Sequence, residues 1–123
     1  MASAATPVKE RVAVIGQGYV GLPVTLAFAR AFPGTVGFDV DSAKVRRLAE
    51  GIDVTGETDA AELTATPVRF TSDEGDLRGA TFFVVAVPTP ITADRRPDLS
   101  YLRAASETVG RALSPGAVVV YES

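Results

Sequence analysis

The sequence predicts a single α/β domain with a doubly wound, parallel sheet of five strands. Short runs rich in Val, Ile and Phe, typical of buried parallel strands, alternate along the chain with stretches whose apolar residues have helical spacing. The chain has 123 residues, of which 46% are apolar and 22% charged. This balance is sufficient for one compact domain with a buried core.

Each element of the predicted fold follows from this alternation. Strands are expected at residues 11–15, 36–38, 68–71, 81–87 and 117–121. Helices are expected at residues 19–32, 43–50 and 99–113, with room for one helical turn around 60–63. Ser42 and Asp98 are the expected caps of the second and third helices, and Gly51 ends the second. Right-handed crossovers between the strands give the expected strand order 3-2-1-4-5.

Composition excludes several function classes. The net charge is −3 without a basic run, so nucleic acid is not an expected partner. No apolar stretch approaches the roughly 20 residues of a membrane span, so no membrane partner is expected either. The chain contains neither cysteine nor histidine, which excludes thiolate metal sites, a cysteine nucleophile and histidine acid–base catalysis within it. We therefore expect no catalytic or metal-binding residue in this chain, and a cytoplasmic location.

The two ends of the sequence carry expectations of their own. Residues 1–9 are small and polar without the features of a signal peptide, and we expect a flexible tail there and one domain over 10–123. Ser123 follows a predicted strand directly, where a helix and further strands would be usual, so a longer parent enzyme is expected. The strand at 117–121 would then be an apolar edge that favours self-association, and we expect a homo-oligomer.

The first turn between strand and helix carries the strongest motif, a G-x-G-x-x-G pattern at residues 16–21. Gly16 permits a tight turn, Gly18 lets a pyrophosphate approach the backbone, and Gly21 lets the helix pack close to the strand. The helix N-terminus offers N–H groups to phosphates. The pattern indicates a dinucleotide-binding Rossmann domain, although a purely structural glycine turn is the alternative. The candidate cofactor residues here are Gly16, Gln17, Gly18, Tyr19, Val20 and Gly21.

Asp39 ends the second predicted strand, eighteen residues after Gly21. An acid at this place accepts hydrogen bonds from the adenosine ribose, and its charge repels a 2′-phosphate, which favours NAD over NADP. Val40 lies beside it. Asp41 is a competing acid whose more natural role is to start the second helix. Lys44 is within reach of the ribose or adenine edge, or else is a solvated surface lysine.

A third segment follows the fourth predicted strand, at the topological switch point where open α/β sheets bind ligands. Val87, Pro88 and Thr89 are candidate cofactor residues there, with a plain turn as the alternative. Glu122, at the end of the fifth strand, faces the expected nicotinamide side, and its role stays open. Tyr101 is interpreted as a packing residue. We assign no chemistry to the remaining acids Glu57, Asp59, Glu62, Asp73, Glu74 and Asp76.

Together these motifs resemble the nucleotide-sugar 6-dehydrogenases, the UDP-glucose/GDP-mannose dehydrogenase family. The matching runs are V-I-G-Q-G-Y-V-G-L-P from Val14, G-F-D-V-D from Gly37, V-P-T-P-I from Val87, P-D-L-S from Pro97 and Y-E-S from Tyr121. P-T-P-I with P-D-L-S is most similar to the branch that acts on UDP-N-acetylglucosamine or UDP-N-acetylgalactosamine. Gln17 departs from the family, which often has Leu there, and its side chain should point away from the phosphates.

The resemblance implies an NAD-dependent oxidation of the C6 alcohol of a UDP-sugar to a carboxylate, through a cysteine thioester, for polysaccharide biosynthesis. In that family the catalytic cysteine and lysine lie beyond the point at which this chain stops. The chain therefore resembles the cofactor-binding half alone and is expected to be inactive by itself. The alternatives are a domain of a UDP-glucose or GDP-mannose dehydrogenase, or a stand-alone NAD-binding sensor.

Overall fold

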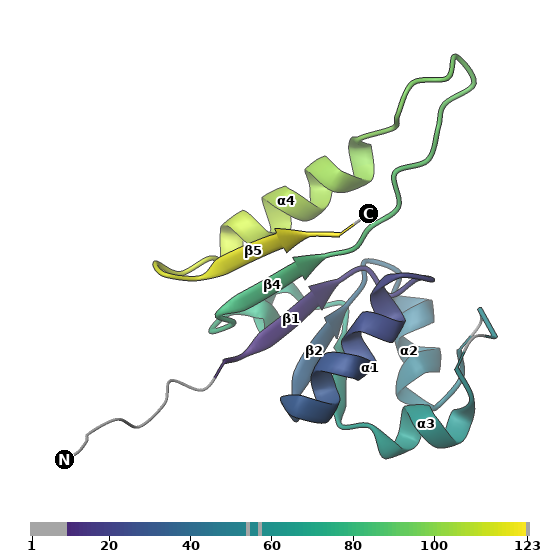
Figure 1. Cartoon of the computed structure of the whole chain (residues 1–123), viewed down its shortest axis with the longest axis vertical. Coiled ribbons are helices and arrows are strands. Elements are labelled where there is room, and N and C mark those ends of the chain that lie inside the picture. Colours follow the sequence, from purple (N-terminus) through teal and green to yellow (C-terminus); the bar gives the residue numbers. More distant parts are fainter. Residues whose placement is uncertain (1–9, 54, 57, 123) are drawn as a thin grey trace.

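The computed structural model describes residues 10–53, 55–56 and 58–122, and the expected tail at residues 1–9 lies outside them (Figure 1). The strands are β1 (Val12–Ile15), β2 (Thr35–Phe38), β3 (Val68–Thr71), β4 (Phe82–Val85) and β5 (Val118–Tyr121). The helices are α1 (Gly21–Ala31), α2 (Ser42–Ala49), α3 (Ala60–Ala65) and α4 (Ser100–Ala112), with a short 3₁₀ helix η1 (Glu74–Leu77).

All five strands are parallel, and their order is β3-β2-β1-β4-β5, which confirms the predicted topology. β1 is central: Ile15 lies opposite Phe38 of β2 and Val85 of β4. Because the strands run the same way and end in register, the segments that follow β1, β2, β4 and β5 emerge at one edge of the sheet.

The sheet is buried on both faces by side chains that alternate along its central strands. On one face, Ala13 and Ile15 pack with Phe83 and with Val109 of α4. On the opposite face, Val12, Val14 and Val84 pack beneath apolar side chains of α1. Burial on both sides explains why these strands are continuous apolar runs in the sequence.

β5 is an edge strand with one uncovered face (Figure 1). Val119 packs against the core beside α4, whereas Val118 and Val120 point to the opposite face and are 49% and 38% exposed. In the part of the chain that the structure describes, no helix shields these two valines. The expected apolar edge is therefore present.

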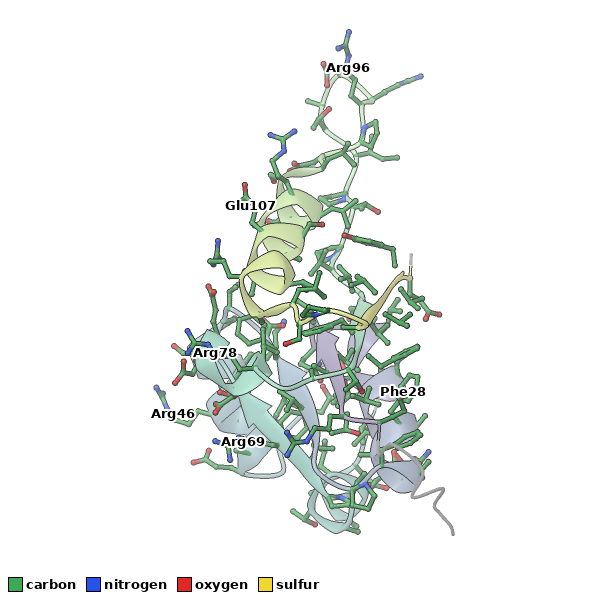
Figure 2. All side chains as sticks on the ribbon, turned by 90° about the vertical axis from the view of Figure 1, so that its left-hand side faces the viewer. Phe28, Arg46, Arg69, Arg78, Arg96 and Glu107 are labelled. Atoms are coloured by element: carbon green, nitrogen blue, oxygen red, sulfur yellow. The ribbon has the colours of Figure 1, made fainter. Side chains whose placement is uncertain are left out.

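The connection from β4 to α4 forms an arm that extends away from the sheet (Figures 1 and 2). An antiparallel bridge between Ile91 and Pro97 closes it, and Arg96 lies near its tip (Figure 2). The arm begins directly after β4, so its first residues belong to the same edge of the sheet as the glycine turn.

Two predicted caps differ from the structure. Asp41, and not Ser42, caps α2, because its carboxylate accepts hydrogen bonds from the backbone N–H groups of Ala43 and Lys44. Leu99 occupies the N-cap position of α4, although the carboxylate of Asp98 accepts a hydrogen bond from the N–H of Ser100. The turn expected around 60–63 is a longer helix, α3, which Asp59 caps.

Candidate functional site

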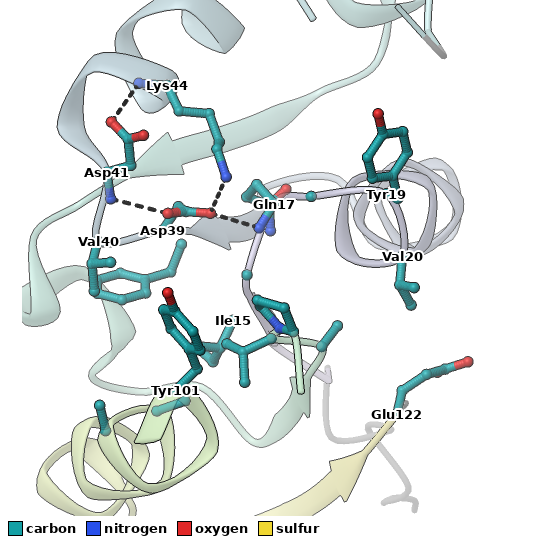
Figure 3. Close-up of a pocket in the computed structure, with 18 of the residues that line it drawn as sticks. Ile15, Gln17, Tyr19, Val20, Asp39, Val40, Asp41, Lys44, Tyr101 and Glu122 are labelled. Carbon is teal, nitrogen blue, oxygen red and sulfur yellow. Dashed lines mark hydrogen bonds and ion pairs between the residues drawn. The ribbon is translucent and has the colours of Figure 1, made fainter. Parts of the chain in front are cut away.

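A cleft of about 650 Å³ lies at the edge of the sheet where the strands end (Figure 3). The glycine turn, the end of β2, the start of the β4–α4 arm and one face of α4 form its walls. Every predicted cofactor residue except Gly21 lines it. The structure therefore brings together residues that the sequence scatters between positions 16 and 122.

The glycine turn at residues 16–21 depends on positions that have no side chain. Gly16 has a φ of +99°, a left-handed conformation that favours glycine. A Cβ placed on Gly18 would meet no atom within 4 Å, so the backbone there faces open space. Among the described residues, no acceptor pairs with the backbone N–H groups of Gly18, Tyr19 and Val20. These donors and the N-terminus of α1 form a cradle suited to an anionic group.

Asp39 joins the end of β2 to this turn. Its Oδ2 accepts hydrogen bonds from the backbone N of Gln17 at 2.9 Å and from Nζ of Lys44 at 3.1 Å, and its Oδ1 accepts one from the backbone N of Asp41 at 3.0 Å (Figure 3). A carboxylate has about four lone-pair sites, so these bonds leave one acceptor site on Oδ1. A hydroxyl in the cleft can donate a hydrogen bond to Asp39 in two ways: to the remaining acceptor site on Oδ1, or to Oδ2 in place of Lys44.

Lys44 and Asp39 form a partly buried ion pair, with 25% and 10% of their side chains exposed. Lys44 is therefore not the solvated surface lysine of the alternative interpretation. Asp41 lies at the start of α2, as expected, and its backbone N–H donates a hydrogen bond to Asp39.

Tyr101 is not the packing residue that the sequence suggested. It is 50% exposed, lines the cleft, and lies across from Val40 (Figure 3). Thr55, Ala104, Ala105 and Thr108 also line the cleft, and none of them was predicted. The spacing of positions 101, 104, 105 and 108 predicts that these residues share one face of a helix. It does not predict that this face lines the cleft.

The opposite end of the cleft is formed by Val87, Pro88, Thr89 and Glu122. Glu122 lies well away from Asp39, and its backbone N–H bonds to the carbonyl of Val85 (Figure 3). Within the described part of the chain, the hydroxyl of Thr89 has no hydrogen-bond partner. The two ends differ in chemistry: one has a carboxylate paired with a lysine, and the other has a proline-rich turn beside the carboxylate of Glu122.

Among the described residues, the His, Cys, Asp and Glu side chains form no group of three or more that could bind a metal ion. In the same residues, no helix combines the length and the apolar character needed to cross a bilayer.

Comparison with known proteins identifies the family. Residues 10–123 match the model of the NAD binding domain of the UDP-glucose/GDP-mannose dehydrogenase family. The chain belongs to this family. The resemblance seen in the sequence is therefore confirmed, and NAD is the cofactor of this NAD-binding domain.

Curated relatives of the NAD-binding domain are nucleotide-sugar dehydrogenases. A UDP-N-acetyl-D-glucosamine 6-dehydrogenase of Pseudomonas aeruginosa is 46% identical over 114 residues, which cover 92% of this chain and 27% of the relative. Protein CapL of Staphylococcus aureus is 43% identical over 112 residues, or 91% of this chain and 26% of that protein. The chain thus spans about a quarter of the length of the relatives it matches.

A solved structure has the same fold. The UDP-D-ManNAc dehydrogenase of Pyrococcus horikoshii superimposes with a TM-score of 0.83 at 33% identity, covering 92% of this chain and 28% of the other. This likeness supports the Rossmann assignment.

Proposed function

We propose that this domain binds NAD across the cleft, with the adenosine at the Asp39 end, the pyrophosphate on the glycine turn and the nicotinamide beside Thr89 and Glu122. The observation that carries the proposal is the hydrogen bond between the Asp39 carboxylate and the Gln17 backbone, which joins an acceptor for ribose hydroxyls to a cradle for phosphates. The cleft, at about 650 Å³, falls within the roughly 300–1,000 Å³ of cofactor pockets.

The residues present fit this cofactor. The open space at Gly18 admits a pyrophosphate, and the N–H groups of Tyr19 and Val20, which have no acceptor among the described residues, are available to hold it. Asp39 accepts the ribose hydroxyls, each charge-assisted hydrogen bond contributing about 1.5–3 kcal/mol. Val40 and Tyr101 present apolar surface for the adenine. When bound, NAD supplies the acceptor for a hydride from a substrate alcohol.

Asp39 and Lys44 have opposite effects on NADP. The carboxylate repels a 2′-phosphate, whereas the ammonium group would attract it, but the ion pair with Asp39 keeps the ammonium group from binding the phosphate. The domain should therefore prefer NAD as long as Asp39 is present. Without Asp39, Lys44 is released to bind the extra phosphate.

Titration calorimetry with NAD and NADP tests this proposal. Asp39→Ala should weaken NAD by roughly tenfold to a hundredfold, the effect of a charged hydrogen bond, and should strengthen NADP. Asp59→Ala is the matched control, since this carboxylate caps α3 outside the cleft. NADP binding as tight as NAD in the unmodified chain would contradict the role of Asp39.

The same proposal extends to the whole enzyme. Its proposed reaction is the oxidation of the C6 alcohol of a UDP-N-acetylhexosamine to a carboxylate, in the cytoplasm. Two relatives at 44–46% identity, both named UDP-N-acetyl-D-glucosamine 6-dehydrogenase, support the substrate class. Assay of the full-length enzyme with UDP-N-acetylglucosamine, UDP-N-acetylgalactosamine, UDP-glucose and GDP-mannose, followed by NADH absorbance, tests the substrate. The present chain should form no carboxylate product with any of them, because it has no thiol to form the covalent intermediate of the second oxidation.

A further inference from the structure

Gln17 differs from its neighbours in the glycine turn, because its side chain points into the protein. It is 1% exposed, whereas Tyr19 and Val20 are exposed at the cleft. Its Nε2 donates a hydrogen bond to the carbonyl of Val14 at 3.1 Å. A carbonyl can only accept, so this contact fixes the amide with its oxygen directed away from β1.

The amide oxygen of Gln17 meets a buried hydroxyl on α1. Oγ1 of Thr25, a fully buried residue, donates to Oε1 of Gln17 at 2.9 Å. The same hydroxyl lies 2.8 Å from the carbonyl oxygen of Gly21, which competes for its single proton. Gln17 thus links β1, through Val14, to the first turns of α1.

Gly37 on β2 provides the room for this side chain. A Cβ on Gly37 would lie 3.0 Å from Oε1 of Gln17 and 2.9 Å from a ring carbon of Phe70. The amide is therefore enclosed by β1, α1 and β2, and its position has little freedom. The backbone of Gln17 is restrained as well, because its side chain is held by hydrogen bonds with Val14 and Thr25.

That backbone is the group that holds Asp39. The N–H of Gln17 donates to Oδ2 of Asp39 at 2.9 Å, on the cleft side of the turn. We propose that Gln17 is a positioning residue for cofactor selection: held by Val14 and Thr25, it directs its N–H at Asp39 and so sets how the carboxylate faces the ribose. Gln17 acts through Asp39 and not by touching the cofactor with its side chain. This inference rests on the proposed function.

The test separates positioning from stability. Gln17→Leu removes the amide, and Thr25→Val removes the hydroxyl with little change in shape, whereas Thr25→Ser retains the hydroxyl. Dissociation constants for NAD and NADP and the thermal unfolding midpoint are measured for each. Thr35→Val is the control, since this buried hydroxyl bonds to the carbonyl of Phe32 away from the cleft.

Gln17→Leu and Thr25→Val should each reduce the NAD-to-NADP affinity ratio by about fivefold, the effect of one hydrogen bond. Thr25→Ser should keep the NAD-to-NADP affinity ratio. Thr35→Val should lower the unfolding midpoint and leave this ratio unchanged. The hydrogen exchange rate of the backbone N–H of Gln17, measured by NMR without cofactor, should rise in Thr25→Val. If Gln17→Leu does not fold, Thr25→Val alone decides the outcome through the same two measurements.

Two results would overturn the inference. Equal loss of NAD and NADP affinity in Thr25→Val would leave Gln17 as a packing residue, as would an unchanged exchange rate of its amide proton. A failure of the proposed function looks different, because the unmodified chain would then show no preference for NAD while the amide exchange still responded to Thr25→Val.

Discussion

Gly21 lies so close to Gly16 that a Cβ on Gly21 would be 1.6 Å from the carbonyl oxygen of Gly16. The backbone at both ends of this contact is held in place, since α1 begins at Gly21 and Gly16 directly follows β1. No rotamer change relieves such an overlap, so the start of α1 depends on glycine at this position.

Gly21→Ala should therefore destabilise the domain by about 3 kcal/mol or more, the upper range for overpacking a core, and should abolish NAD binding. Urea unfolding measures the first effect and calorimetry the second. Gly110→Ala in α4 is the matched control, because a Cβ there meets nothing within 4 Å. This control should gain about 0.5–1 kcal/mol in the free energy of unfolding. Equal stability of the two variants would contradict the assigned role of Gly21.

Tyr101→Ala should weaken NAD by about 1–3 kcal/mol, the range for stacking of a base on an aromatic ring, because the half-exposed ring faces Val40 across the cleft. Tyr101→Phe should bind NAD nearly as well as the unmodified chain. Calorimetric titration of both variants provides the comparison. A loss of affinity in Tyr101→Phe equal to that in Tyr101→Ala would assign the effect to the hydroxyl instead.

Acid should loosen the contact between η1 and α4. Glu74 accepts two hydrogen bonds from Arg111, at 2.9 and 3.0 Å, and this contact holds the pKa of Glu74 below its ordinary value of 4.5. A carboxylate whose pKa is lower in the folded state stabilises the fold fully above its unfolded pKa. The contribution of Glu74 is then lost as the pH falls through the lowered value.

Unfolding by urea between pH 7 and pH 3 tests this dependence. Glu74→Gln should flatten the decrease in stability in the acid range, whereas Glu50→Gln, at an exposed carboxylate after α2, should leave the decrease unchanged. Parallel curves for Glu74→Gln and the unmodified chain would show that the Arg111 contact adds nothing to stability.

The chain alone should self-associate through the open face of β5. Val118 and Val120 are exposed side by side on this edge strand, beside the partly buried Phe82 of β4. Two copies that cover these valines would remove apolar surface from water. Light scattering after size exclusion should show a mass that rises with concentration.

Val120→Lys should then give a monomer, because it places a charge in the contact. Leu113→Lys, at an exposed leucine that follows α4, is the control and should still associate. A monomeric unmodified chain at every concentration would refute the prediction.

The strand order, the glycine turn and the position of Asp39 at the end of β2 could be predicted from the sequence, because alternating strands and helices with G-x-G-x-x-G at the first turn together indicate a Rossmann sheet. The cap of α2 was not predictable, since Asp41 and Ser42 are both good capping residues and the choice depends on how the chain leaves β2. Tyr101 could not be placed either. Its helix face is evident from spacing, but whether that face meets the sheet or the cleft depends on the length of the arm before it.

The pairing of β1 with β4 also has a consequence during synthesis. The backbone N–H of Arg11 bonds to Thr81, seventy residues further along the chain. A ribosome that adds roughly 5–20 residues per second takes about 4–14 s to make the intervening segment. During that interval the central strand Val12–Ile15 lacks β4, one of its two neighbours in the sheet. Slower translation of the segment between the two strands should therefore increase aggregation of the nascent domain.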